Sequence, residues 1–134
     1  MMMVRILFFL MVIVLAACTE PVDREQQARQ AAADTVTAAY NYLLNGQYEQ
    51  FLAYRATTDS MPQTYCSQML TAYKQFMAQQ QQAHQGICSF AVSDVQRDST
   101  LGVMQVFLQL SYGDSTQERI VVPVVEQGSE WRLK

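Results

Sequence analysis

The chain has 134 residues, with 9 Lys and Arg against 12 Asp and Glu, one His and three Cys. This length suits a single domain, and the hydrophobic share of 50% argues against a chain that is disordered throughout. The net charge of −3 comes without any cluster of basic residues. Because phosphate binding needs grouped Lys and Arg, nucleic acid is not expected as a partner.

The first residues have the pattern of a bacterial export signal. Arg5 supplies a positive charge, and an apolar run from Ile6 to Ala17 follows it. The run is shorter than the roughly 20 residues that a membrane-spanning helix needs. It leads into Leu15, Ala16, Ala17 and Cys18, which resemble the lipobox of bacterial lipoproteins. An ordinary secretory signal with a chance cysteine and a short membrane anchor are the alternatives.

The lipobox resemblance implies that residues 1–17 are cleaved off as a signal peptide and that Cys18 is then acylated. The lipid bilayer would be the first partner of the mature chain, with each buried methylene contributing about 0.8 kcal/mol. Thr19, not Asp, follows the cysteine. In a Gram-negative host this implies the outer membrane, with the protein facing the periplasm. Residues 18–22 are expected to form a lipidated tether, and residues 23–134 the folded domain.

A long helix is predicted from Asp23, because apolar residues recur at spacings of three and four. They are Ala28, Ala32, Val36, Ala39, Tyr40 and Leu43. Asn45-Gly46 is a typical left-handed stop for this helix. A second, short helix is expected to carry Tyr48, Phe51, Leu52 and Arg55.

A third helix is predicted after the turn at residues 56–61. Asp59 or Ser60 is expected to cap it, with Pro62 in its first turn. Its apolar face comprises Tyr65, Met69, Tyr73, Phe76 and Met77. The glutamines at 79–82 are interpreted as a solvated helix face, and the helix is expected to end near residues 84–86.

After Gly86 the hydrophobic period changes to two, which is typical of strands. Phe90 and Val92 begin the first strand, and a turn at residues 97–99 ends it. The next strand turns its even-numbered residues, Met104 to Tyr112, toward the helices. A hairpin at residues 113–115 leads to a strand over 116–126, in which Pro123 favours a sheet edge or a bulge. Residues 131–133 form a short last strand.

Helices followed by an antiparallel meander describe an α+β domain, with N-terminal helices packed on a curved sheet of three to four strands. The order resembles small lipoproteins of unknown function that carry a nuclear-transport-factor-2-like (cystatin-like) domain. The resemblance is carried by Ala38-Ala39-Tyr40, Leu44 to Tyr48, Gly86-Ile87, Tyr112-Gly113-Asp114, and Val121 to Val125 with Gly128 and Trp131-Arg132-Leu133. It implies a cone-shaped fold, often with a pocket between sheet and helices. That fold hosts isomerases, dehydratases and binding modules, so it leaves the function open.

In an oxidising compartment, Cys66 and Cys88 are candidates for a disulfide. An unbroken helix from Cys66 to Gln85 would separate them by roughly 28 Å at about 1.5 Å per residue. A disulfide needs Cα atoms within about 7 Å. Two unpaired thiols are therefore slightly favoured over a helix that folds back at the glutamines.

Catalytic signals are weak. His84 is expected in an exposed last helical turn, and no spacing of His, Cys and carboxylates resembles a metal site. An isomerase-type reaction would need a buried carboxylate of raised pKa, for which Asp34 and Asp94 are weak candidates and Asp59 a third. The rings of Tyr40, Phe51, Tyr54, Tyr73, Phe76 and Trp131 are candidates to line a pocket, with a plain aromatic core as the alternative.

Two functions follow as hypotheses. The first is an anchored, non-catalytic envelope lipoprotein that binds a protein partner or a small ligand, with no cofactor. The second is an isomerase- or cyclase-type enzyme with a buried carboxylate in the cone. A homodimer through the exposed sheet face is a further expectation, with Phe107, Gln105, Gln109, Val121 and Val125 as its patch.

Overall fold

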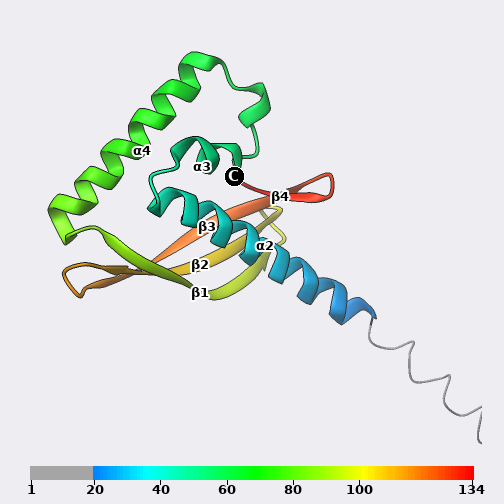
Figure 1. Cartoon of the computed structure of the whole chain (residues 1–134). Coiled ribbons are helices and arrows are strands. Elements are labelled where there is room, and N and C mark those ends of the chain that lie inside the picture. The colour runs from blue at the N-terminus through cyan, green and yellow to red at the C-terminus, as the bar shows by residue number, and fades with distance from the viewer. Residues whose placement is uncertain (1–19) are drawn as a thin grey trace, which may run out of the picture.

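The structure, a computed structural model, describes residues 20–134. Three α-helices are followed by a four-stranded antiparallel sheet with the order β1-β2-β3-β4 (Figure 1). The helices are α2 (Glu20–Leu44), α3 (Tyr48–Ala53) and α4 (Gln63–His84), with a short 3₁₀ turn at Thr58–Ser60. The strands are β1 (Ile87–Asp98), β2 (Val103–Tyr112), β3 (Gln117–Gln127) and β4 (Glu130–Leu133). The predicted α+β class is confirmed.

Helix α2 lies across one face of the sheet and forms the centre of the core (Figure 1). Its predicted stripe is buried at Ala32, Val36, Ala39 and Leu43. The helix begins at Glu20, so the expected tether at residues 18–22 is already helical in its last three positions. It stops where predicted, because Gly46 adopts a left-handed φ of 73°.

Strand β2 supplies the sheet side of the core. Met104, Val106, Leu108, Leu110 and Tyr112 are all buried, as their alternation predicted. Strand β3 lies between β2 and β4, which at first sight conflicts with Pro123 marking an edge. However, β4 ends opposite Val124, so Pro123 stands where the free edge of β3 begins. The Lys134 N–H donates to the Pro123 carbonyl there, at 3.0 Å.

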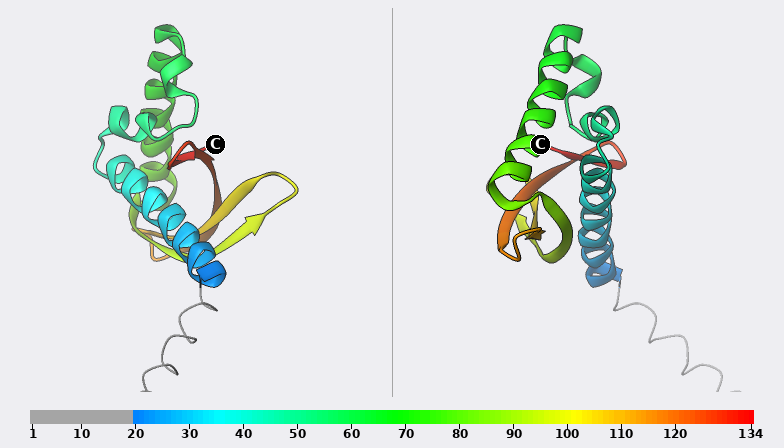
Figure 2. Two further views of the ribbon diagram at one scale, coloured as in Figure 1. Left: turned by 90° about the vertical axis from the view of Figure 1, so that its right-hand side faces the viewer. Right: turned by 60° about the vertical axis from the view of Figure 1, so that its left-hand side comes forward.

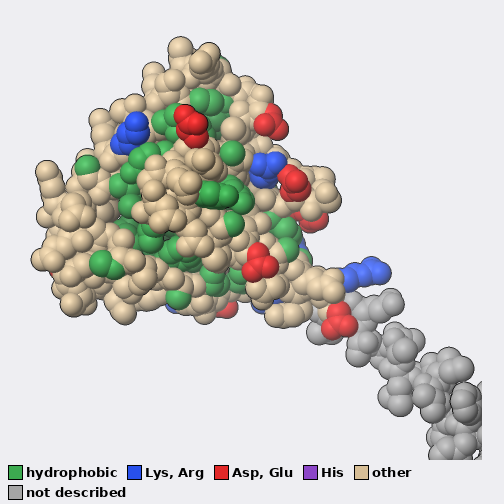
Figure 3. All heavy atoms as spheres, in the orientation of Figure 1, with side chains coloured by type: hydrophobic (Ala, Val, Ile, Leu, Met, Phe, Trp, Pro, Cys, Tyr) green, Lys and Arg blue, Asp and Glu red, His purple; other side chains and the backbone are tan. Residues whose placement is uncertain are grey.

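Helix α4 extends away from the sheet, with only its last turns near the start of β1 (Figure 2). None of its residues is buried, although its apolar spacing predicted a packed face. Tyr65 and Phe76 remain 46% and 41% exposed. Hydrophobic side chains accordingly lie open on the face that Figure 3 shows. The predicted cap was wrong, because Pro62 takes the N-cap position and no side chain of Asp59 or Ser60 caps the helix.

The last residues tie the sheet to the segment after α3. The Leu133 N–H donates to the Tyr54 carbonyl at 2.8 Å, and the Leu133 carbonyl accepts the Ala56 N–H at 2.7 Å. Leu133 thereby forms an isolated parallel bridge with Arg55. This long-range contact closes the helical layer onto β4.

Candidate functional site

A groove of about 910 Å³ runs between α2 and β1. The α2 wall repeats every three or four residues, so that one helix face lines the whole groove. This wall comprises Gln26, Arg29, Gln30, Ala33, Asp34, Thr37, Asn41, Leu44 and Asn45. The opposite wall is β1 from Ile87 to Val95, Ser93 excepted. The sequence analysis missed this groove, although a row of uncharged polar residues beside the apolar stripe of α2 was a readable signal.

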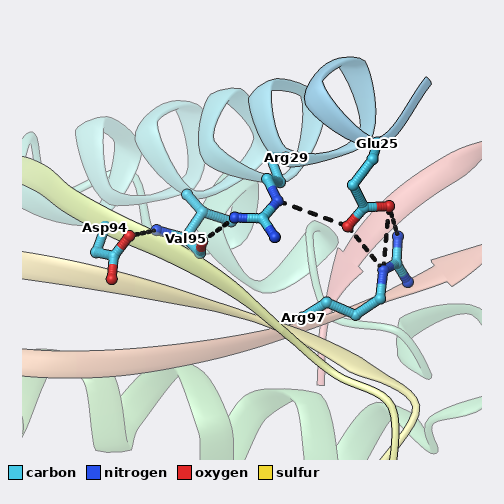
Figure 4. Close-up of polar contacts among 5 residues, drawn as sticks. All are labelled: Glu25, Arg29, Asp94, Val95 and Arg97. Carbon is cyan, nitrogen blue, oxygen red and sulfur yellow. Dashed lines mark hydrogen bonds and ion pairs between the residues drawn. The ribbon is translucent and has the colours of Figure 1, made fainter. Parts of the chain in front are cut away.

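One end of the groove is closed by side chains from both walls (Figure 4). Arg29 reaches from α2 and donates from Nη1 to the Val95 carbonyl at 3.1 Å. The Val95 N–H donates to Oδ1 of Asp94 at 2.8 Å. Gln96 donates from Nε2 to the other oxygen of Asp94, also at 2.8 Å. Both backbone groups of Val95 on the free edge of β1 are thus occupied.

An ion pair fastens the same end. Arg97 donates from Nε to Glu25 Oε1 at 2.9 Å and from Nη2 to Oε2 at 3.1 Å. Arg29 lies one helical turn from Glu25, with 3.5 Å between Nε and Oε1. The hydrogen bond from Arg97 is the main cause that lowers the pKa of Glu25, and it raises the pKa of Arg97 in return. The N-terminal part of α2 is therefore fixed to the end of β1.

Neither weak catalytic candidate is buried. Asp34 lines the groove but is exposed and accepts a hydrogen bond from Gln30 at 2.8 Å. Asp94 was expected in the phase of Phe90 and Val92, but a bulge between Val92 and Asp94 shifts the register. Val95 packs on the core in its place, and the Gln96 amide and the Val95 N–H lower the pKa of Asp94. Isomerase-type chemistry requires a shift in the opposite direction.

The candidate pocket aromatics divide into three groups. Tyr40, Phe51 and Tyr73 form a cluster in the core, with ring centroids 5.6 Å apart for Tyr40–Phe51 and 4.9 Å for Phe51–Tyr73. Burial raises the pKa of both tyrosines. Tyr54 and Trp131 line a second hollow of about 420 Å³, beside Thr35 and Arg132. Phe76 is exposed on α4.

His84 has a carboxylate partner that the sequence analysis did not foresee. Its Nδ1 lies 3.1 Å from Asp114 Oδ2, and its ring stacks on Tyr112 with centroids 4.5 Å apart. Thr116 and then His84 lower the pKa of Asp114 by hydrogen bonding. Burial, followed by the hydrogen bond to Glu118, raises the pKa of Tyr112 to about 12. These contacts join the end of α4 to the β2–β3 hairpin.

Cys66 and Cys88 are both free, and α4 runs unbroken between them. The unbroken helix between the two cysteines is the arrangement for which a disulfide was not expected. Cys88 is exposed on β1, where it lines the groove. Cys18 and the lipobox residues Leu15, Ala16 and Ala17 lie outside the residues that the structure describes. Within residues 20–134, no cluster of three or more His, Cys, Asp or Glu is arranged to hold a metal ion.

The residues that were expected to form a dimer patch lie on the outer face of the sheet. Phe107 lies opposite Val121, and the Arg119 guanidinium stands 4.4 Å from the Phe107 ring centroid. Val121 is 47% exposed. Among the helices at 20–134, none is long and apolar enough to cross a bilayer.

Comparison with protein-family models finds no match, and comparison with curated proteins finds none either. The structure is similar to a crystal structure at 2.00 Å of a Campylobacter jejuni protein that is provisionally described as an NTF2-like transpeptidase. The match has a TM-score of 0.59 and covers 75% of this chain and 94% of the other. The fold is nuclear-transport-factor-2-like. At 8% sequence identity, this likeness concerns the fold alone.

Proposed function

We propose that this chain is a membrane-anchored envelope lipoprotein whose domain binds a partner in the α2–β1 groove without catalysis. The observation that carries the proposal is the groove itself, of about 910 Å³, which is lined by α2 from Gln26 to Asn45 and by β1 from Ile87 to Val95. Its carboxylates are Asp34, which is exposed, and Asp94, whose pKa is lowered. Such a site favours binding over acid–base chemistry.

The anchor part of the proposal is supported by the N-terminal pattern, namely Arg5, the apolar run to Ala17, and the lipobox ending in Cys18. Glu20, the first described residue of α2, lies two positions after the cysteine that would be lipidated. Asn45, at the far end of the groove, then lies about 37 Å along the helix from Glu20 at about 1.5 Å per residue. Thr19 supports the outer membrane, facing the periplasm, in a Gram-negative host.

The anchor is tested by labelling cells that express the full chain with radioactive palmitate. We expect label on the wild-type chain and none on Cys18→Ser, with Cys88→Ser as the matched control that keeps the label. Label that persists on Cys18→Ser would contradict the proposal.

The binding site is tested by a photo-crosslinking amino acid at Asn41, an exposed groove position, in living cells. The matched position is Gln117, which is exposed on the outer face of the sheet. We expect a discrete crosslinked partner from Asn41 that is absent from Gln117. Crosslinks only from Gln117, at the mass of two chains, would instead identify the sheet face as the interface.

A further inference from the structure

The free edge of β1 has two halves that differ in how their backbone groups are occupied. Strand β1 pairs with β2 on one side only, so that in its regular stretches, which two bulges at Ile87/Ser89 and Val92/Asp94 separate, every second residue turns its N–H and C=O outward, toward the groove. At Val95 the Arg29 guanidinium and the Asp94 carboxylate occupy both outward groups. From Ile87 to Val92, no side chain of residues 20–134 does so. We name the stretch around the capped Val95 the capped half (94–97) and the other stretch the open half (87–92).

The α2 wall of the groove carries mainly uncharged side chains. Thr37, Asn41 and Asn45 line it, Arg29 and Asp94 stand at the capped end, and Asp34, which accepts a hydrogen bond from Gln30, is the further charged residue of the lining. A wall with one carboxylate outside the capped end imposes little selection on the charge of an occupant. Unpaired N–H and C=O groups along a strand, in contrast, match the backbone of a second strand.

We propose that the occupant of the groove is an extended polypeptide segment that adds a strand to β1 along the open half. The inference rests on the proposed function and specifies the chemistry of its partner. The added strand would face the regular stretch from Ser89 to Val92 and would span at least about four residues, or about 13 Å at about 3.3 Å per residue. Arg29 and Asp94 end the added strand, because the outward groups of Val95 already have partners.

A second copy of this chain fits the open half less well than a bare segment does. A strand placed there has β1 on one side and α2 on the other, since both line the groove. In a second copy of this chain, β1 is flanked by its own β2 and its own α2, and both would have to be accommodated beside the groove. An extended segment that belongs to no sheet brings no flanking strand or helix with it.

The test uses the full chain in detergent micelles and a displayed library of linear eight-residue peptides. Enriched peptides are synthesised and added to the isotope-labelled protein, and amide hydrogen exchange is followed by NMR. We expect outward amides of the open half to exchange at least tenfold more slowly, while those at 94–97 keep their rates. Asn41→Lys, which fills the groove, should abolish this protection. Gln75→Lys, an equal charge change on the exposed side of α4, should leave it intact.

The double variant Arg29→Ala with Asp94→Ala gives an independent readout of the register. With both the carbonyl and the N–H of Val95 uncapped, peptide-dependent protection should extend beyond Val92 to the Val95 amide. Protection that remains confined to the open half would contradict the assigned role of Arg29 and Asp94 in ending the strand.

The remaining outcomes separate the inference from the proposed function. Peptides that shift the α2 groove resonances but leave β1 exchange unchanged would overturn strand addition and support groove binding. Protection without peptide that rises with protein concentration would identify a second copy as the occupant and overturn the inference. A library that enriches no peptide would also overturn it, and the Asn41 crosslink then decides the proposed function by itself.

Discussion

Helices α2 and α4 have similar lengths, 25 and 22 residues, and similar apolar spacing, yet they contribute very differently to the core. Helix α2 buries Ala32, Val36, Ala39 and Leu43 against the sheet, whereas α4 buries no residue. The reason is position, because α2 crosses the sheet while α4 contacts mainly α3 and the start of β1. Helical periodicity therefore identifies a face that can be buried, and the partner surface determines how far it is buried.

The largest expected effect comes from a pair of matched leucines, one on each helix. Leu43→Ala on α2 removes a side chain that is 3% exposed and should lower the free energy of unfolding by about 2–4 kcal/mol. Leu70→Ala on α4 should cost about 1 kcal/mol or less, because its side chain is already partly solvated. Urea unfolding at constant m-value measures both. Equal losses would show that α4 is as tightly packed as α2.

A smaller loss is expected where α4 joins the sheet. A Cβ at Gly113 would overlap with the Gln85 carbonyl oxygen, which is backbone and yields little. Gly113→Ala should therefore cost roughly 1–3 kcal/mol. Gly128→Ala is the control: it has a φ of 62° and no atom within 4 Å of the new Cβ, and should cost about 1 kcal/mol. Thermal unfolding compares them, and a smaller loss at Gly113 would refute the close contact.

The contact between α4 and the aromatic core is tested at Tyr73. Its hydroxyl is buried without a hydrogen-bond partner among residues 20–134; Arg55 is near enough to affect its pKa but is not in hydrogen-bonding geometry. Tyr73→Phe should thus be neutral, or stabilising by up to about 1 kcal/mol. Tyr112→Phe removes a hydroxyl that donates to Glu118 and should destabilise. A loss of stability in Tyr73→Phe would reveal a partner for its hydroxyl.

The smallest effect is expected at the ion pair between Arg97 and Glu25, which holds the N-terminal end of α2 against β1. Because Arg97 lowers the pKa of Glu25, this pair stabilises the fold above the ordinary Glu pKa, and its contribution disappears as the pH falls through the lowered value. Arg97→Ala should raise the pKa of Glu25 toward its ordinary range, which NMR titration of the carboxyl carbon measures. An unchanged Glu25 pKa would show that the contact is not formed in solution.

Much of the fold was predictable because it depends on local periodicity. The α2 stripe and the inward face of β2 follow from spacings of 3.6 and 2, and the ends of α2 and α4 follow from Asn45-Gly46 and residues 84–86. Asp94 was misplaced because one extra residue at a bulge reverses the strand phase, and alternation does not reveal such an insertion.

The candidate site was not predictable in the same way. Arg29 and Val95 are separated by 66 residues, and Arg97 and Glu25 by 72. Their contacts exist only once α2 has been placed beside the edge of β1. Neither residue type nor spacing identifies such pairs in a single sequence. The uncharged polar face of α2 was visible, but its meaning depends on which strand lies opposite.

The position of α2 at the start of the domain sets an order of events during synthesis. Leu43 and the rest of the buried α2 stripe are made first, whereas Leu133, which ties β4 to the segment after α3, follows about 90 residues later. At about 5–20 residues per second, synthesis alone keeps the stripe uncovered for at least roughly 5 to 18 seconds. Throughout this interval the growing chain presents an apolar helix without its sheet, so the chain has to be kept soluble until its last strand has been made.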